Sequence, residues 1–280
     1  MLRTTLITSL SLLAVGCGEE ASGMITATVY GEEFIEDSIP VAAGDEAGFN
    51  DGWSLVFDTF LVSIGDTRAD GRADASAPEF YIVDLAQSSS GNGFEMTSFA
   101  APGGDYDHYG YTIKSDANAT GTNALAADVT AMKAAGYSMW IKATATKGGV
   151  TKTLDWGFQM QLAYTNCEMG VTVDGDDVEM QATIHSDHLF YDDATSPEPE
   201  ISFQLIADAD GKAGAAADGM ITLAELAASD IRTQTRYQVG SLRDIRGQAI
   251  TNLEQYIQIQ ATTLGHINGE GHCADVTVTP

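Results

Sequence analysis

Alternating apolar and polar positions run through most of the first two-thirds of the chain. Short segments rich in β-branched and aromatic residues, bounded by Gly, Asp or Pro, are typical of strands. We expect strands at residues 25–30, 53–64, 80–85, 106–113, 137–146, 151–164, 178–185 and 201–206. Between 137–146 and 151–164 the glycines Gly148 and Gly149 supply the positive φ angles of a tight hairpin turn. About eight or nine such strands predict a mainly β fold, an antiparallel β-sandwich.

Helical periodicity appears in a few places only. Residues 123–135 carry apolar side chains on one side, which predicts a short helix inserted among the strands. Beyond residue 206, a Thr-x-x-Glu capping pattern at Thr222 predicts a short helix, and Ser241 begins a second one that ends at Gly265. We therefore expect a sandwich over residues 24–206, with residues 207–280 forming a helical appendage packed on it.

The first sixteen residues have the layout of an export signal. One positive charge at Arg3 precedes an apolar run and then small residues. The run is shorter than the roughly 20 apolar residues that a spanning helix needs. Residues 14–17 resemble the lipobox of bacterial lipoproteins, which implies cleavage before Cys17 and its lipidation. An ordinary secretory signal cleaved nearby is the alternative.

The lipobox resemblance sets the expected location of the protein. Residues 1–16 would be removed, and residues 17–23 would form the lipidated Cys17 and a tether to the membrane. Gly18 directly after the cysteine is, by family analogy, compatible with sorting to the outer membrane. We therefore expect a lipid-anchored protein of the bacterial outer membrane, facing the periplasm or the cell surface.

The charge of the chain is strongly acidic. The full chain has 13 basic and 40 acidic residues, and removing residues 1–16 takes away only Arg3, so the net charge changes from −27 to −28. Such a surface repels nucleic acid and attracts cations. The charge argues against a nucleic-acid-binding role and indicates no particular protein partner.

Two cysteines remain once Cys17 is lipidated. In an oxidising compartment, Cys167 and Cys273 predict one disulfide bond. It would close a loop long enough to stabilise the fold by about 4 to 5 kcal/mol in the chain-entropy model. The alternative is a pair of thiolate metal ligands.

The strongest motif in the chain is a split calcium loop of the EF-hand type. Residues 218–226 match loop positions 5 to 12 and the residue that follows, including the required glycine and final glutamate. Two further acids precede a six-residue insertion at 212–217, which would bulge outward. The predicted calcium ligands are Asp208, Asp210, Asp218, the carbonyl group of Met220, and Glu225. In the alternative, Glu225 only completes a capping box with Thr222.

Four of the five histidines occur as two close pairs, His185 with His188 and His266 with His272. Imidazole is the commonest ligand of zinc and copper, and nearby carboxylates orient such ligands. The candidate carboxylates are Asp187, Asp192, Asp193 and Glu270. Positions three apart in a straight strand face opposite sides, so the first pair shares a metal only if the chain bends between them. Histidines paired with neighbouring acids are the alternative.

No catalytic motif is present in the sequence. It contains no Gly-x-Ser-x-Gly elbow, no Ser-x-x-Lys pair and no His-Glu-x-x-His. Paired carboxylates for glycoside chemistry cannot be singled out among 40 acids. We therefore expect a protein that is not an enzyme. A hydrolase would require a deep cleft with converging acids.

Three strings suggest a family: "HSDHLFYDD", "IADADG…DGMITLAEL" and "TLGHINGEGHC". They resemble those of predicted bacterial lipoproteins with an EF-hand-like loop, over nearly the whole mature chain. The resemblance implies an exported protein with that loop and carries no activity with it. A fainter similarity, in the strand pattern of 53–64 and the histidine-bearing strands, is to periplasmic copper-binding proteins paired with dihaem enzymes.

These observations lead to two hypotheses. The first is a membrane-anchored protein with a binding or structural role, in which calcium stabilises the junction between the sandwich and its helices. The second is a periplasmic copper or zinc protein that uses the four clustered histidines.

Overall fold

The computed structural model describes residues 21–44, 46–71 and 74–280 of the chain. The predicted signal peptide and the lipidation site at Cys17 lie outside the described residues. The described part is mainly β, with two sheets and short helices, and it confirms the predicted fold class. Among the described residues, no helix combines the length and apolar character needed to cross a membrane.

The strands vary widely in length, from two residues to eighteen. They are β1 (Gly23–Tyr30), β2 (Ser54–Gly71), β3 (Ala75–Asp84), β4 (Phe94–Ala101), β5 (Gly104–Ile113), β6 (Thr120–Gly121), β7 (Met139–Lys147), β8 (Val150–Phe158), β9 (Gln161–Val173), β10 (Val178–Ile184), β11 (Met220–Thr222), β12 (Gly265–Ile267) and β13 (Cys273–Thr279).

The helices are short and connect or flank the strands. They are α1 (Glu32–Glu36), α2 (Ala126–Ala135), α3 (Gln204–Ala207), α4 (Leu223–Ala227) and α5 (Leu253–Gln260). Single turns of 3₁₀ helix add Ser186–Phe190, Thr235–Tyr237, Val239–Ser241 and Ala261–Thr263.

The larger sheet is organised around the long strand β2. Its main path runs β11-β8-β7-β2-β5-β9-β13, and β3 and β6 branch from β2. The first half of β2 pairs with β7 and the second half with β5, on the same edge, while β3 occupies the other edge. The smaller sheet has the order β12-β10-β1-β4. Most pairs are antiparallel as predicted, but β1 with β10, β8 with β11 and β3 with β6 are parallel.

The predicted hairpin is present as β7 and β8. Lys147 pairs with Val150, and Gly148 and Gly149 have φ angles of 55° and 84°, which the tight turn requires. Along β7 every second residue from Met139 to Ala145 is buried, so the period-two pattern of the sequence is the pattern of burial.

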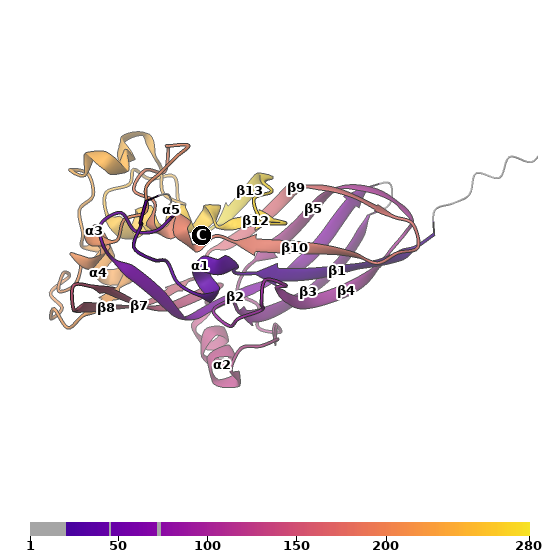
Figure 1. The fold of residues 1–280 in the computed structure, drawn as a ribbon, viewed down its shortest axis with the longest axis horizontal. Coiled ribbons are helices and arrows are strands. Elements are labelled where there is room, and N and C mark those ends of the chain that lie inside the picture. The colour runs from indigo at the N-terminus through magenta and orange to yellow at the C-terminus, as the bar shows by residue number, and fades with distance from the viewer. Residues whose placement is uncertain (1–20, 45, 72–73) are drawn as a thin grey trace, which may run out of the picture.

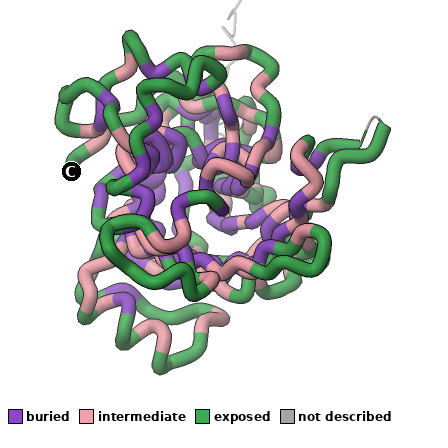
Figure 2. Tube along the Cα trace, turned by 90° about the vertical axis from the view of Figure 1, so that its left-hand side faces the viewer, coloured by how far each residue is buried: buried purple, intermediate pink, exposed green. Residues whose placement is uncertain are grey.

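The two sheets share one hydrophobic core. Figure 1 shows β1, β4 and β10 lying along β2, β3, β5 and β9, while α3, α4, α5 and their loops gather at the opposite end of the molecule. Buried residues lie inside this arrangement, and exposed ones follow the loops around it (Figure 2). Helix α2 packs on the outside, where Met132 closes a small second cluster over Leu61, Phe80 and Ile82.

The expected strand at 201–206 is wrong. Residue Ile201 forms only isolated bridges, and Gln204 begins helix α3. One Asp51 carboxylate oxygen accepts hydrogen bonds from the backbone N–H groups of Phe203 and Gln204, both at 2.7 Å. A helix start needs partners for its free N–H groups. Here the partner comes from a residue about 150 positions earlier in the chain, so local propensity could not reveal it.

The prediction of a long helix from Ser241 to Gly265 is also wrong for the first half of that segment. The carboxylate of Asp244 accepts from the N–H groups of Arg246 and Gln248, which forms a tight turn through Gly247 with φ of 77°. The helix begins only at α5, where Asn252 caps the N–H group of Gln255.

Two strand boundaries differ from the predictions because the chain changes partners. The expected strand 151–164 is interrupted after Phe158, since β8 pairs with β7 whereas β9 pairs with β5. Residues 207–280 are not only helical. They add β11 and β13 to the larger sheet and β12 to the smaller one.

The predicted disulfide between Cys167 and Cys273 is present. These residues are directly opposite each other on the antiparallel strands β9 and β13. The bond therefore ties the C-terminal edge strand β13 to its neighbour β9 in the larger sheet, one residue after His272.

Candidate metal centre

Three histidines meet where the smaller sheet ends. Strand β10 stops at Ile184, so His185 lies just outside it and His188 lies in the 3₁₀ turn that follows. His266 is the central residue of β12, and it pairs with Thr183 of β10. The 3₁₀ turn supplies the bend that a shared site for His185 and His188 requires.

One ring nitrogen from each of His185, His188 and His266 lies within 4.8 Å of the others. The ring centroids of His185 and His266 are 4.2 Å apart, and those of His188 and His266 are 5.3 Å apart. Nitrogens bound to one tetrahedral zinc ion are about 3.3 Å apart, given Zn–N bonds of about 2.0 to 2.1 Å. Modest rotations of the rings would bring this set to a single ion.

The hydrogen bonds around His188 settle which of its nitrogens carries a proton. Nδ1 lies 2.9 Å from the hydroxyl oxygen of Thr263. That hydroxyl donates its own proton to the carbonyl group of Gln260 at 2.8 Å, so it must accept from His188. Nε2 of His188 is then left with a free lone pair.

His185 and His266 also have one nitrogen each that is free for a metal. Nε2 of His185 lies 3.3 Å from the carbonyl oxygen of Gly269 and 3.2 Å from a carboxylate oxygen of Glu32. Both groups accept, so Nε2 carries the proton and Nδ1 keeps its lone pair. Nδ1 of His266 is buried with no hydrogen-bond partner among the described residues. A buried nitrogen without a partner is costly unless a ligand satisfies it.

The electrostatic surroundings keep the imidazoles of His188 and His266 uncharged. Burial and the neighbouring imidazoles of His185, His188 and His272 lower the pKa of His266 to about 3. Burial also lowers the pKa of His188, although the carboxylate of Asp187 opposes the shift. At neutral pH both rings are therefore in the unprotonated form that binds metals.

Glu32 is a residue of this site that the sequence analysis missed. It follows β1, about 150 residues before the histidines, and no local pattern marks it. Burial raises the pKa of Glu32, with the adjacent His185 opposing the shift. Only the parallel pairing of β1 with β10, whose ends carry Glu32 and His185, brings the two groups together.

The remaining predicted groups lie around the three histidines or elsewhere. His272 is exposed, and its ring centroid is 5.2 Å from that of His266, but it is outside the set of three converging nitrogens. Asp187 accepts a hydrogen bond from the Tyr191 hydroxyl group. Glu270 is close enough to affect the pKa values of Glu32 and His188.

Two of the candidate carboxylates serve other parts of the fold. Asp192 forms an ion pair with Arg236, and Asp193 accepts from the backbone and hydroxyl of Thr195. Neither carboxylate belongs to the group of converging metal-ligand atoms found in the described chain.

The acids of the predicted calcium loop have partners within the protein. Asp210 is paired with Lys152 and accepts from the N–H group of Gly219. Asp208 accepts from the Gln204 amide, and the exposed Asp218 accepts from the N–H group of Met220, the first residue of β11.

Glu225 completes the capping box of α4. One carboxylate oxygen accepts from the N–H and hydroxyl groups of Thr222, at 2.8 and 2.9 Å, and the other accepts from the N–H group of Gly211 at 2.8 Å. Within the described chain these acids do not form a group of three converging oxygens. Calcium binding by this loop stays a prediction, and the geometry lends it no support.

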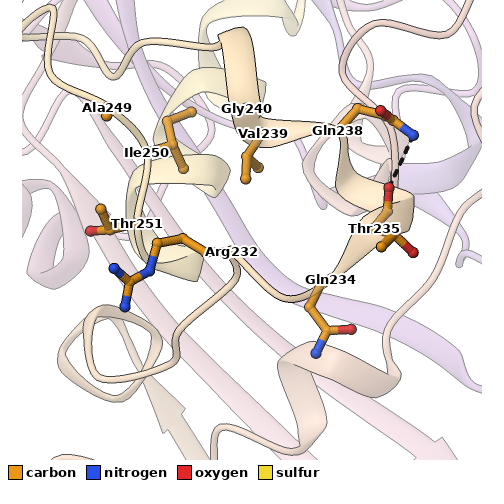
Figure 3. A pocket seen from close by; sticks show the side chains of 9 residues that line it. All are labelled: Arg232, Gln234, Thr235, Gln238, Val239, Gly240, Ala249, Ile250 and Thr251. Atoms are coloured by element: carbon orange, nitrogen blue, oxygen red, sulfur yellow. Dashed lines mark hydrogen bonds between the residues drawn. The ribbon is translucent and has the colours of Figure 1, made fainter.

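A separate cavity of about 640 Å³ lies at the helical end of the molecule (Figure 3). Turns at 232–240 and 249–251 form its wall, and Gln238 donates a hydrogen bond to the carbonyl group of Thr235 there. Arg232, the one charged residue of this lining, is paired with Asp230. The lining contains no carboxylate, so this cavity does not supply the converging acids that a hydrolase would need.

Comparison with protein-family models, with curated proteins and with solved structures found no match to this chain.

Proposed function

We propose that this chain is an exported, membrane-anchored protein that binds a transition-metal ion, zinc or copper, through His185, His188 and His266. The single observation that carries the proposal is the convergence of three buried or half-buried ring nitrogens within 4.8 Å. Imidazole nitrogen is a ligand that zinc and copper prefer, whereas calcium takes oxygen ligands.

The surroundings of the three rings support the same proposal. Thr263 and Gly269 accept hydrogen bonds from His188 and His185, and such partners orient metal-binding histidines and raise their basicity. The unpartnered Nδ1 of His266 gains a partner when a metal binds. The acidic surface, with a net charge of −27 for the whole chain, attracts cations toward the protein.

Membrane anchoring is the second part of the proposal, and it rests on the sequence of residues 1–17. A lipid at Cys17 would hold the protein at the outer membrane, in the oxidising compartment where the Cys167–Cys273 disulfide is stable. Globomycin, which blocks lipoprotein signal peptidase, should cause the unprocessed precursor to accumulate. Normal processing of the precursor in the presence of globomycin would refute the proposed membrane anchoring. A Cys17→Ser variant that still partitions into the membrane would also refute it.

Calorimetric titration of the mature protein, purified in detergent and stripped with a chelator, tests the metal site. We expect one zinc or copper(II) ion per chain in the wild type. His188→Ala should weaken binding by more than about 100-fold, since loss of a ligand costs more than the 10 to 100-fold typical of an outer partner.

His108→Ala is the matched control, because His108 is an exposed histidine of β5 that lies outside the group of converging nitrogens. It should bind metal as the wild type does. The proposal would be refuted if the wild type bound neither zinc nor copper. It would also be refuted if His188→Ala and His108→Ala lost equal amounts of metal affinity. Calcium binding lost in Asp218→Ala would instead support the predicted calcium loop.

A further inference from the structure

We propose that Glu32 is the positioning residue of this metal site, acting through His185 from outside the set of ligands. The proposal rests on the proposed function and adds a fourth residue to it. Its carboxylate oxygen lies 3.2 Å from Nε2 of His185. That nitrogen is the one that carries the proton, so the contact with the carboxylate leaves the lone pair of Nδ1 free for a metal.

The carboxylate is outside the converging group itself. Glu32 offers two oxygens, yet the group with mutual distances within 4.8 Å contains only His185, His188 and His266. A carboxylate that contacts the far nitrogen of a metal-binding histidine fixes its tautomer and raises its basicity. The contact of Glu32 with Nε2 of His185 fits this arrangement, in which a carboxylate binds the imidazole that binds the metal.

The backbone at Glu32 is held in an unfavourable conformation to reach this position. Its φ angle is 54°, in the left-handed region that a residue with a Cβ atom seldom adopts. Gly31 before it packs so closely on Leu85 that an added Cβ would lie 2.8 Å from the Leu85 Cβ. This contact fixes the turn after β1. Backbone strain of this kind occurs where the surrounding structure enforces it, often at functional sites.

Glu32 is the more exposed partner in its contact with His185. Its side chain is 27% exposed, compared with 7% for that of His185. It lines a cavity of about 290 Å³ together with Tyr30, Glu33 and Phe34.

The experiment compares three variants of the mature protein: Glu32→Asn, Glu32→Gln and Glu33→Gln. Asn tolerates the left-handed conformation but is too short to reach His185. Gln keeps the length and one acceptor while removing the charge. Glu33→Gln is the matched control, because it removes the neighbouring charge from the same cavity and leaves the His185 contact intact.

Zinc affinity is measured by competition with a chromophoric chelator. We expect Glu32→Asn to weaken binding by about 10 to 100-fold, as for other outer partners of metal ligands. Glu32→Gln should lose less than Glu32→Asn, since it retains an acceptor for the His185 proton. Glu33→Gln should stay within about twofold of the wild type.

Two further readouts separate positioning from other roles. In the copper(II) form, electron paramagnetic resonance should show the same nitrogen coordination in Glu32→Asn as in the wild type, because Glu32 is not a ligand. The metal-free Glu32→Asn variant should unfold at a temperature no lower than that of the wild type, because Asn suits the backbone better. A merely structural role would lower that temperature.

The outcomes distinguish this proposal from the proposed function. If the wild type binds zinc and loses it in His188→Ala, while Glu32→Asn matches Glu33→Gln, only the role of Glu32 is overturned. A change of copper coordination in Glu32→Asn would make Glu32 a ligand and would also overturn it. If the wild type binds no metal, both proposals fall.

Discussion

The histidine cluster and the acidic loop use their polar side chains in opposite ways. In the cluster, one nitrogen each of His185, His188 and His266 converge, and Nδ1 of His266 has no hydrogen-bond partner in the described chain. In the loop, Asp210 and Glu225 accept hydrogen bonds from lysine and backbone groups. Polar groups that already have partners stabilise a fold, whereas converging groups that lack them are available to a ligand.

The distribution of charge follows the same division. The loop is acidic in sequence, but Lys152 forms an ion pair with Asp210 and lowers the pKa of its carboxyl group. In the cluster, burial lowers the pKa of His188 and of His266 and keeps these two rings neutral. The loop's carboxylates therefore bind groups at the junction between β8 and α4, whereas the cluster has converging nitrogens that could hold a metal ion.

Removal of the disulfide should have the largest effect on stability. Cys167 and Cys273 are 106 residues apart, and the chain-entropy model assigns a cross-link of this span about 4 to 5 kcal/mol. The double variant Cys167→Ala/Cys273→Ala should lose about that much free energy of unfolding in urea denaturation. The double variant removes the covalent link between β13 and β9, next to the cluster, and changes no contact of the acidic loop. A loss below about 1 kcal/mol would contradict the entropic account.

Glu225→Ala should destabilise the protein by about 3 kcal/mol, whether or not calcium is present. The change leaves the N–H groups of Thr222 and Gly211 without partners and removes a capping box. Asp218→Ala, at an exposed position with one backbone contact, should cost less than about 1 kcal/mol. Urea denaturation with calcium and with chelator checks both. If Glu225→Ala destabilises the protein only when calcium is present, the loop binds calcium.

Thermal stability with added metal should show which region, the histidine cluster or the acidic loop, binds a metal ion. A free zinc concentration about 100 times its Kd stabilises the folded state by about 2.7 kcal/mol. For a chain of this size that raises Tm by roughly 5 to 10 °C. We expect this shift with zinc, its loss in His188→Ala, and no shift with calcium at millimolar concentration. Differential scanning calorimetry measures all three, and a calcium-dependent rise in His188→Ala would reverse the comparison.

Mild acid should weaken the metal-free protein through His266. Its folded pKa of about 3 lies below the ordinary value of 6.5, so the unfolded chain takes up a proton first as the pH falls below 6.5. The contribution of His266 to the free energy of unfolding is fully present above pH 6.5 and is lost as the pH falls toward 3. At pH 5 the loss is about 2 kcal/mol. Urea denaturation at pH 7 and pH 5 should show this loss in the wild type and not in His266→Asn. Equal losses in both would assign the effect to other groups.

The local features of the fold could be predicted from the sequence. Alternation located β1, β2 and the hairpin of β7 and β8, and paired glycines located its turn. The capping box at Thr222 is present as the pattern indicated. The cysteine count was enough for the disulfide, since only two candidates remained. Each of these features depends on neighbours in sequence or on simple pairing.

The candidate site was decided by the tertiary structure. The sequence supplied the histidines but could not tell which of them meet, because that depends on the bend after Ile184 and on the pairing of β10 with β12. Glu32 was invisible because its partner lies about 150 residues away, joined only through the parallel pair β1 and β10. The strand expected at 201–206 became α3 for the same reason, since the partner of its N–H groups is the distant Asp51. Local patterns determine local hydrogen bonding and burial, whereas a site is made by whichever distant groups the sheets bring together.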